Sequence, residues 1–115
     1  MEPEGDAVSP EEPIEIDAET DLESAVSTYD VVLADFYADW CGPCQMMEPA
    51  VEAVAGDTDA AVVKVDVDRL QNLAAQYGVQ GIPTLVLFAD GEPVERMVGM
   101  QTEDSLSSSI AAYTN

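Results

Sequence analysis

Apolar residues gather in runs that predict β-strands. The runs at residues 31–37, 60–67, 84–89 and 93–98 are rich in valine, leucine and other strand-forming side chains. Residues 14–16 alternate between isoleucine and glutamate and predict one further short strand. The run at 31–37 is hydrophobic almost throughout, which is typical of a strand that is covered on both faces of its sheet.

Two helices are predicted in the first half of the chain. Thr20–Glu23 has the pattern of a capping box, and apolar residues follow it at helical spacing. A second helix is expected to begin at the turn Cys41–Cys44 and to run to about Ala55, with Gly56 as its stop. Pro49 lies inside this second helix, where its missing N–H and its ring should produce a kink.

Two more helices are predicted in the second half. Asp68 is expected to cap a helix that ends at Gly78, and Thr102 is expected to cap the last helix. The last two strands are separated only by residues 90–92, so they should form an antiparallel hairpin. The order of elements therefore predicts an α/β fold with a central mixed sheet flanked by helices. Its N-terminal βαβαβ part is parallel, and the antiparallel hairpin and a helix complete it.

A single domain accounts for most of the 115 residues. Residues 14–115 hold all the predicted helices and strands, and their number leaves no room for a second domain. Residues 1–13 contain proline, glycine and several glutamates but almost no large apolar side chain. This composition predicts a disordered acidic tail, to which we assign no role.

The charge balance of the chain is unusual. Aspartate and glutamate number 24, lysine and arginine number 3, and the formal net charge is −21. A surface this acidic repels phosphate backbones and anionic lipids, which argues against nucleic-acid and membrane partners. Its self-repulsion needs screening, and the Debye length falls from about 10 Å at 0.1 M salt to about 3 Å at 1 M. The composition therefore predicts a halophilic protein from a cell with molar internal salt, most simply a haloarchaeon.

The sequence shows no targeting or membrane segment. Residues 1–25 lack the positive charges and the apolar core of a secretory signal, and no apolar run approaches the about 18 residues of a membrane span. We therefore expect a cytoplasmic protein. In that compartment, two closely spaced cysteines indicate redox or metal chemistry rather than a structural disulfide.

Both cysteines lie in the turn Cys41-Gly42-Pro43-Cys44 at the start of a predicted helix. The unpaired N–H groups and the dipole of a helix N-terminus favour a thiolate at Cys41. Pro43 should preorganise the turn, and Gly42 leaves the sulfur of Cys41 approachable. We expect Cys41 to attack a substrate disulfide and Cys44 to resolve the mixed disulfide that forms.

Asp35 and Lys64 are candidates for the proton chemistry of this pair. Asp35 interrupts an apolar strand, and burial raises a carboxyl pKa toward neutrality, where the group can act as a base for Cys44. Lys64 is the single lysine and also lies in a strand. If the two strands are neighbours, its ammonium could pair with Asp35 and moderate the rise in pKa.

Other interpretations of the cysteine pair stay open at this point. A tetrahedral zinc site would need carboxylates beside the two thiolates, because the chain has no third cysteine and no histidine. We therefore expect no metal. Two classes of function remain: a catalytic thiol-disulfide oxidoreductase, or a non-catalytic binding or accessory module that uses the same fold.

Three segments resemble the thioredoxin family. Residues 34–44 are similar to the active-site segment of that family, residues 77–85 to the segment around its cis-proline, and residues 94–99 to its last strand and the glycine that follows. The similarity covers almost all of the chain outside the tail. Gln45 stands where a basic residue often follows the second cysteine, and Tyr37 stands where many members have a second tryptophan.

The resemblance implies the thioredoxin fold, with Asp35 as a buried carboxylate, Lys64 as its neighbour and Ile82–Pro83 as a cis peptide that faces the cysteines. It also implies a protein-disulfide reductase, for which we expect a monomer and no cofactor. Its expected partners are disulfide-containing client proteins and a flavin-dependent thioredoxin reductase. A surface for an extended client segment is expected from Trp40, Gly42, Pro43, Gly81, Ile82, Pro83, Val98 and Gly99.

Overall fold

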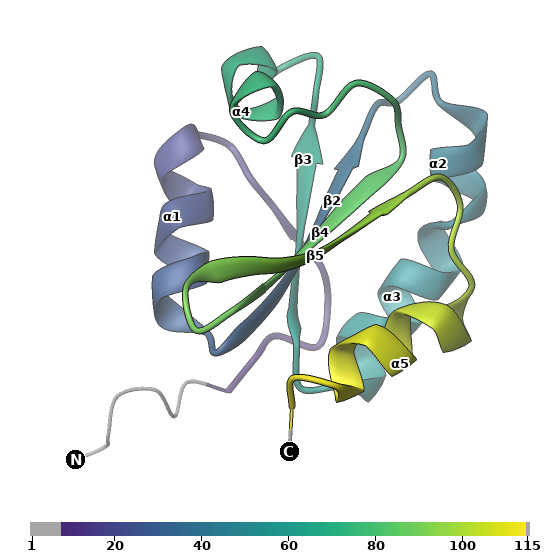
Figure 1. Ribbon diagram of the computed structural model, residues 1–115. Coiled ribbons are helices and arrows are strands. Elements are labelled where there is room, and N and C mark those ends of the chain that lie inside the picture. The colour runs from purple at the N-terminus through teal and green to yellow at the C-terminus, as the bar shows by residue number, and fades with distance from the viewer. Residues whose placement is uncertain (1–7, 115) are drawn as a thin grey trace.

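A five-stranded mixed sheet forms the centre of the computed structural model, which describes residues 8–114 (Figure 1). Across the sheet the order of the strands is β1-β3-β2-β4-β5. β1, β3 and β2 run parallel, whereas β4 is antiparallel to both β2 and β5. This topology confirms the predicted parallel part and C-terminal hairpin. The strands are β1 (Ile14–Glu15), β2 (Val31–Tyr37), β3 (Ala61–Asp66), β4 (Thr84–Ala89) and β5 (Glu92–Val98).

Helices cover both faces of the sheet, as Figure 1 shows. α1 and α4 pack on one face, and α3 and α5 pack on the other, with α2 leading into α3. Within the part of the chain that the structure describes, no helix is long and apolar enough to span a membrane. The helices are α1 (Glu19–Thr28), α2 (Gly42–Met46), α3 (Glu48–Asp57), α4 (Gln71–Gln76) and α5 (Glu103–Ala111).

Alternation along the central strands decides which side chains reach the α3 face. Phe36 of β2 belongs to the core under α1 and α4, whereas Leu33 of β2 and Val62 of β3 belong to the core under α3 and α5. Successive side chains of a strand point to opposite faces. Asp35 therefore shares the α3 face with Leu33, and Lys64 shares it with Val62.

Pro49 divides the second predicted helix into two. α2 and α3 meet at Met47, because Pro49 has no N–H to donate to the preceding turn. The predicted kink is therefore confirmed, in the form of a break. Gly56 does not stop α3 as predicted, since the helix continues to Asp57 and ends where the N–H of Thr58 bonds the carbonyl of Val54 at 3.0 Å.

The predicted cap of α1 is wrong by two residues. The N-cap is Ala18 rather than Thr20, and an alanine side chain cannot accept a hydrogen bond. The carboxylate of Asp21 takes over part of this role, because its Oδ2 accepts the N–H of Ala18 at 3.0 Å. An acidic residue in the first turn also interacts favourably with the helix dipole.

The helices of the second half give one wrong cap and one confirmed cap. α4 begins after Leu70, and Asp68 lies in the preceding turn, where its N–H donates to Oδ1 of Asp66 at 2.9 Å. Gly78 follows α4 with a φ of 67°, in the left-handed region, as a stop residue requires. Thr102 caps α5 as predicted, with its hydroxyl oxygen accepting a backbone N–H of the first turn at 3.0 Å.

The hairpin of β4 and β5 forms one edge of the sheet. Asp90 and Gly91 make its turn, with φ values of 53° and 88°. The register shifts between Leu87 and Phe88, which marks a β-bulge. Pro93 lies in the edge strand β5 and has no N–H to offer to the ladder. These features distort and interrupt the outer edge.

The tail is described only in part. Residues 8–13 contain neither helix nor strand, and residues 1–7 lie outside the described residues. The predicted disorder of residues 1–13 and the domain boundary at residue 14 therefore stay predictions. The carbonyl oxygen of Glu11 lies 3.6 Å from the point where a Cβ on Gly56 would stand, so this part of the tail passes beside α3.

Candidate active site

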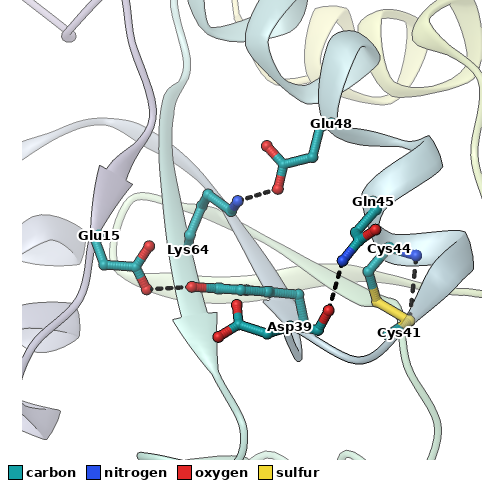
Figure 2. A network of polar contacts seen from close by, with 8 residues as sticks. Glu15, Asp39, Cys41, Cys44, Gln45, Glu48 and Lys64 are labelled. Atoms are coloured by element: carbon teal, nitrogen blue, oxygen red, sulfur yellow. Dashed lines mark hydrogen bonds and ion pairs between the residues drawn. A yellow bond between two sulfur atoms is a disulfide. The ribbon is translucent and has the colours of Figure 1, made fainter.

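Cys41 and Cys44 form a disulfide at the start of α2 (Figure 2). Their Cα atoms are 5.3 Å apart. Cys41 is the N-cap of the helix, and its Sγ accepts the backbone N–H of Cys44 at 3.2 Å. Pro43 lies in the first turn, where a missing N–H removes no helical hydrogen bond. The turn therefore directs a backbone donor at the sulfur of Cys41.

The disulfide is approached past exposed neighbours. Cys41 and Cys44 are 4% and 3% exposed, whereas the adjacent Trp40 is 70% exposed. A Cβ on Gly42 would meet no atom within 4 Å, so the space beside the pair is open. The indole N–H of Trp40 donates to Oδ2 of Asp68 at 2.8 Å, a contact that the sequence analysis missed.

The predicted cis peptide and last strand lie beside the cysteines. The Ile82–Pro83 bond is cis, as the resemblance implies. Ile82 packs against the buried cluster that contains both cysteines. The N–H of Gly99 donates to the carbonyl of Pro83 at 2.9 Å, which joins the end of β5 to this loop. Val98 is 65% exposed, and Gly81 is exposed as well. Ile82 therefore contacts the cysteine cluster, and the Pro83–Gly99 hydrogen bond ties the end of β5 to the loop that carries Ile82.

Asp35 is buried in an environment that favours its neutral form. Its exposed fraction is 2%, and its Oδ1 has no hydrogen-bond partner within the described residues. Burial raises the pKa of Asp35 from 3.8 to about 7, with Lys64 lowering it and Glu48 and Glu15 raising it further. The carboxyl therefore exchanges its proton near neutral pH.

Lys64 neighbours Asp35 but holds a different carboxylate. The two residues are register partners on the adjacent strands β2 and β3. Within residues 8–114, however, the ion pair of Lys64 is with Glu48 and not with Asp35. Figure 2 shows Lys64 reaching from β3 toward Glu48 at the start of α3. The Nζ of Lys64 also lies 4.3 Å from the ring centroid of Tyr37, a cation–π contact.

The two positions that depart from the family pattern make contacts of their own. The hydroxyl of Tyr37 donates to Oε2 of Glu15 at 2.6 Å, and burial together with this hydrogen bond raises the pKa of Tyr37. The side chain of Gln45 donates to the carbonyl of Asp39 at 2.6 Å, across the turn that precedes Cys41 (Figure 2).

Glu48 is the site residue that the sequence analysis missed. It lies four residues after Cys44, a spacing that tends to place two residues on the same side of a helical segment. This spacing is the one feature of the sequence that places Glu48 near Cys44, but the break between α2 and α3 at Met47 interrupts the helix on which the spacing depends. Within residues 8–114, no group of three or more histidine, cysteine, aspartate or glutamate residues is arranged to hold a metal ion.

A disulfide between residues three apart at a helix N-terminus, on a mixed sheet and beside a cis-proline loop, defines a thiol-disulfide oxidoreductase. The profile of the thioredoxin family matches residues 13–112. The chain belongs to the thioredoxin family and has its protein-disulfide oxidoreductase activity. Proteins of this family act on disulfide substrates and are reduced by thioredoxin reductase.

Several known thioredoxins are similar to the chain over most of its length. The thioredoxin of Staphylococcus epidermidis is 46% identical over 91 residues, which are 77% of this chain and 86% of that protein. The thioredoxin of Chlamydia trachomatis is 48% identical over 84 residues, 72% of this chain and 82% of that protein. The structure of a mutant thioredoxin from Halobacterium salinarum NRC-1 has 60% identity and a TM-score of 0.91, and the similarity covers 95% of this chain and 96% of that chain.

Proposed function

We propose that Cys41 is the nucleophile and Cys44 the resolving cysteine in the reduction of protein disulfides. One observation carries this assignment: the backbone N–H of Cys44 donates to Sγ of Cys41 at 3.2 Å. A donor directed at a sulfur stabilises negative charge there once the disulfide is reduced. Cys41 also adjoins the exposed Trp40 and the open space at Gly42, which supports its role as the cysteine that a client contacts first.

The reaction transfers two electrons from the dithiol form of the protein to the client. The thiolate of Cys41 attacks one sulfur of the client disulfide and expels the other sulfur as a thiolate, which takes up a proton. Cys44 then loses its proton, attacks Sγ of Cys41 and expels the second client sulfur. The client leaves with two thiols, and the protein is left with the Cys41–Cys44 disulfide that the structure contains.

Asp35 is the proposed base for the second step. A base is most effective when its pKa lies near the working pH, and burial brings the pKa of Asp35 to about 7. Its Oδ1 has no hydrogen-bond partner within residues 8–114, so a lone pair is available for the proton that Cys44 gives up. Lys64, as its neighbour across the β2–β3 pair, tempers the cost of the charged carboxylate.

The proposed client surface surrounds the disulfide on two sides. Trp40, Gly42 and Pro43 are exposed on one side, and the Ile82–Pro83 loop with Val98 and Gly99 lies on the other. An extended client segment would bind beside Ile82 through backbone hydrogen bonds, a mode that gives affinity without demanding one sequence. Gly81 leaves room for that segment, because a Cβ on Gly81 would meet no atom within 4 Å.

The proposed setting is the cytoplasm of a cell with molar internal salt. The net charge of −21 requires screening, and the Halobacterium salinarum relative is similar over almost the whole chain. In that setting a flavin-dependent thioredoxin reductase would return two electrons to the disulfide, and the protein would act as a monomer on disulfide-containing clients.

The test of the cysteine roles is insulin reduction by dithiothreitol in molar KCl. Cys41→Ser is expected to abolish catalysis, and Cys44→Ser is expected to accumulate a mixed disulfide with insulin. Unchanged turnover of the Cys41→Ser variant would refute the assignment.

The role of Asp35 has a separate test. Asp35→Asn should slow release of the client from the mixed disulfide near neutral pH, and it should remove a step with a midpoint of about 7 from the pH dependence of release. Rates of release that superimpose for wild type and variant across neutral pH would show that Asp35 is not the base.

A further inference from the structure

The ammonium of Lys64 lies near more than one carboxyl group, so it cannot neutralise them all. Lys64 is the single lysine of the chain, and its strand position pairs it with Asp35. Its Nζ nevertheless binds Oε2 of Glu48, as the dashed line in Figure 2 shows. Glu15 lies on the other side of Lys64, and its carboxylate accepts a hydrogen bond from the hydroxyl of Tyr37.

The position of the ammonium is fixed by its surroundings. The side chain of Lys64 is 14% exposed, and its Nζ lies against the ring of Tyr37 at 4.3 Å from the centroid. Glu48 occupies the first turn of α3, where a carboxylate interacts favourably with the helix dipole. Glu48 is anchored by its helix, so it draws the flexible lysine side chain away from the sheet and toward α3.

The carboxyl of Asp35 gains no ion pair from Lys64 within residues 8–114. Its Oδ1 is unsatisfied within the described residues, although a cation lies on the adjacent strand. Among the described residues, the charged groups that act on the pKa of Asp35 are Lys64 from β3, Glu48 from α3 and Glu15 from β1. The attraction between opposite charges falls with distance, so an ammonium bonded to Glu48 stabilises the Asp35 carboxylate less than a direct pair would.

We propose that Glu48 is a positioning residue: its carboxylate binds the ammonium of Lys64 and thereby keeps it from forming a direct ion pair with the buried carboxyl of Asp35. The inference rests on the proposed role of Asp35 as the base for Cys44. With Glu48 in place, burial dominates at Asp35, and the carboxyl binds a proton firmly enough to accept one from a thiol. With Lys64 released, Asp35 would ionise at lower pH and become a weaker base.

The chain offers a matched control for a test by mutation. Glu52 lies one turn further along α3, and it lines the same cavity of about 490 Å³ as Glu48 and Lys64. Glu48→Gln and Glu52→Gln remove the same charge from the same helix and the same cavity. Within the described residues, only Glu48 is bonded to Lys64.

The measurement is a carbon NMR titration of the Asp35 side-chain carboxyl in the oxidised protein, in molar KCl. Glu48→Gln should lower the midpoint by about 1 pH unit, because Asp35 gains an opposite charge and loses a like charge nearby. Glu52→Gln should move it by less than a third of that amount. An unchanged midpoint in Glu48→Gln, or an equal fall in both variants, would overturn the proposal.

A second comparison tests whether Glu48 acts through Lys64. In a Lys64→Met background, Glu48→Gln should shift the midpoint by less than half as much as it does in the wild type, because no ammonium remains to be released. An equal or larger shift in that background would overturn the proposal. The pH dependence of client release should follow the same order of variants.

These titrations keep the two proposals apart, because they need no turnover. In one outcome, Asp35 titrates as expected in every variant, but the rate of client release has no midpoint that matches. That result would refute Asp35 as the base and would support Glu48 as the positioning residue. In the other outcome, client release has the same midpoint as the Asp35 titration, and Glu48→Gln shifts neither midpoint. That result would refute the role of Glu48 and would support Asp35 as the base.

Discussion

Asp35→Asn removes a buried ionisable group with little change of shape, and its effect on stability should depend on pH. In the folded protein the pKa of Asp35 is about 7, whereas its ordinary value is 3.8. Between these two values the folded state holds a proton that the unfolded state has lost. The contribution of Asp35 to stability therefore falls as the pH rises through this window, and it is constant above about pH 7.

The size of the effect follows from the difference between the two pKa values. One pKa unit corresponds to about 1.4 kcal/mol. From about pH 5 to above pH 7, the wild type should thus lose about 3 kcal/mol relative to Asp35→Asn. Solvent screening reduces this figure little, because Asp35 is only 2% exposed and its Oδ1 has no hydrogen-bond partner within residues 8–114.

Urea unfolding of the oxidised proteins in molar KCl measures this difference. The free energy of unfolding of the variant minus that of the wild type should rise between about pH 5 and about pH 7 and then level off. Subtraction removes the contribution of the other carboxylates, and the disulfide removes that of the thiols. Asp39→Asn, which removes an exposed carboxylate near the same turn, is the matched control for the loss of one negative charge. A flat difference for Asp35→Asn would refute the reasoning.

Three further predictions concern a helix cap, a glycine and the thiolate. Thr102→Ala should lower the free energy of unfolding in urea by about 1 kcal/mol, because α5 loses its side-chain cap. Thr102→Ser keeps a hydroxyl and should retain most of that stability. Equal losses in the two variants would contradict the role of Thr102 as the cap. Gly99→Ala should lower the free energy of unfolding by about 1 to 2 kcal/mol, because φ is 92° at that residue. Gly56→Ala, within α3, should leave stability unchanged or raise it. An unchanged stability of Gly99→Ala would contradict the prediction. In the reduced protein, the thiolate fraction of Cys41 at fixed pH should rise between about 0.1 M and about 1 M salt, as followed by ultraviolet absorbance, because the negative field of the carboxylates is screened. No dependence on salt would mean that the helix N-terminus outweighs this field.

The sheet and the reactive pair could be predicted from the sequence because their signals are local. The hydrophobic run at 31–37 became β2, and the short link at 90–92 became the turn of an antiparallel hairpin. Cys41 and Cys44 are three residues apart, so their geometry follows from one helical turn. Burial of Asp35 followed from its place in an apolar run.

The errors concern two things that the local pattern does not decide: where the chain enters a helix, and which distant group a side chain meets. Thr20 has a good capping side chain, but the chain enters α1 two residues earlier, and Asp21 satisfies the backbone instead. Asp68 has a capping side chain too, but its carboxylate binds the indole of Trp40. The strand adjacency of Lys64 and Asp35 and the lowering of the Asp35 pKa by Lys64 agree with the prediction, but the direct ion pair of Lys64 is with Glu48, which the packing of α3 on the sheet brings to it.

The outer edge of β5 has a consequence for solubility in concentrated salt. Repulsion between negative surfaces keeps copies of a protein apart in dilute buffer, but it fades when the Debye length shrinks to about 3 Å. A proline in the edge strand, Pro93, and the irregular register of β5 opposite Leu87 and Phe88 are features that hinder strand pairing between molecules. Steric hindrance of this kind does not depend on ionic strength. The edge should therefore resist intermolecular sheet growth at ionic strengths where charge no longer can.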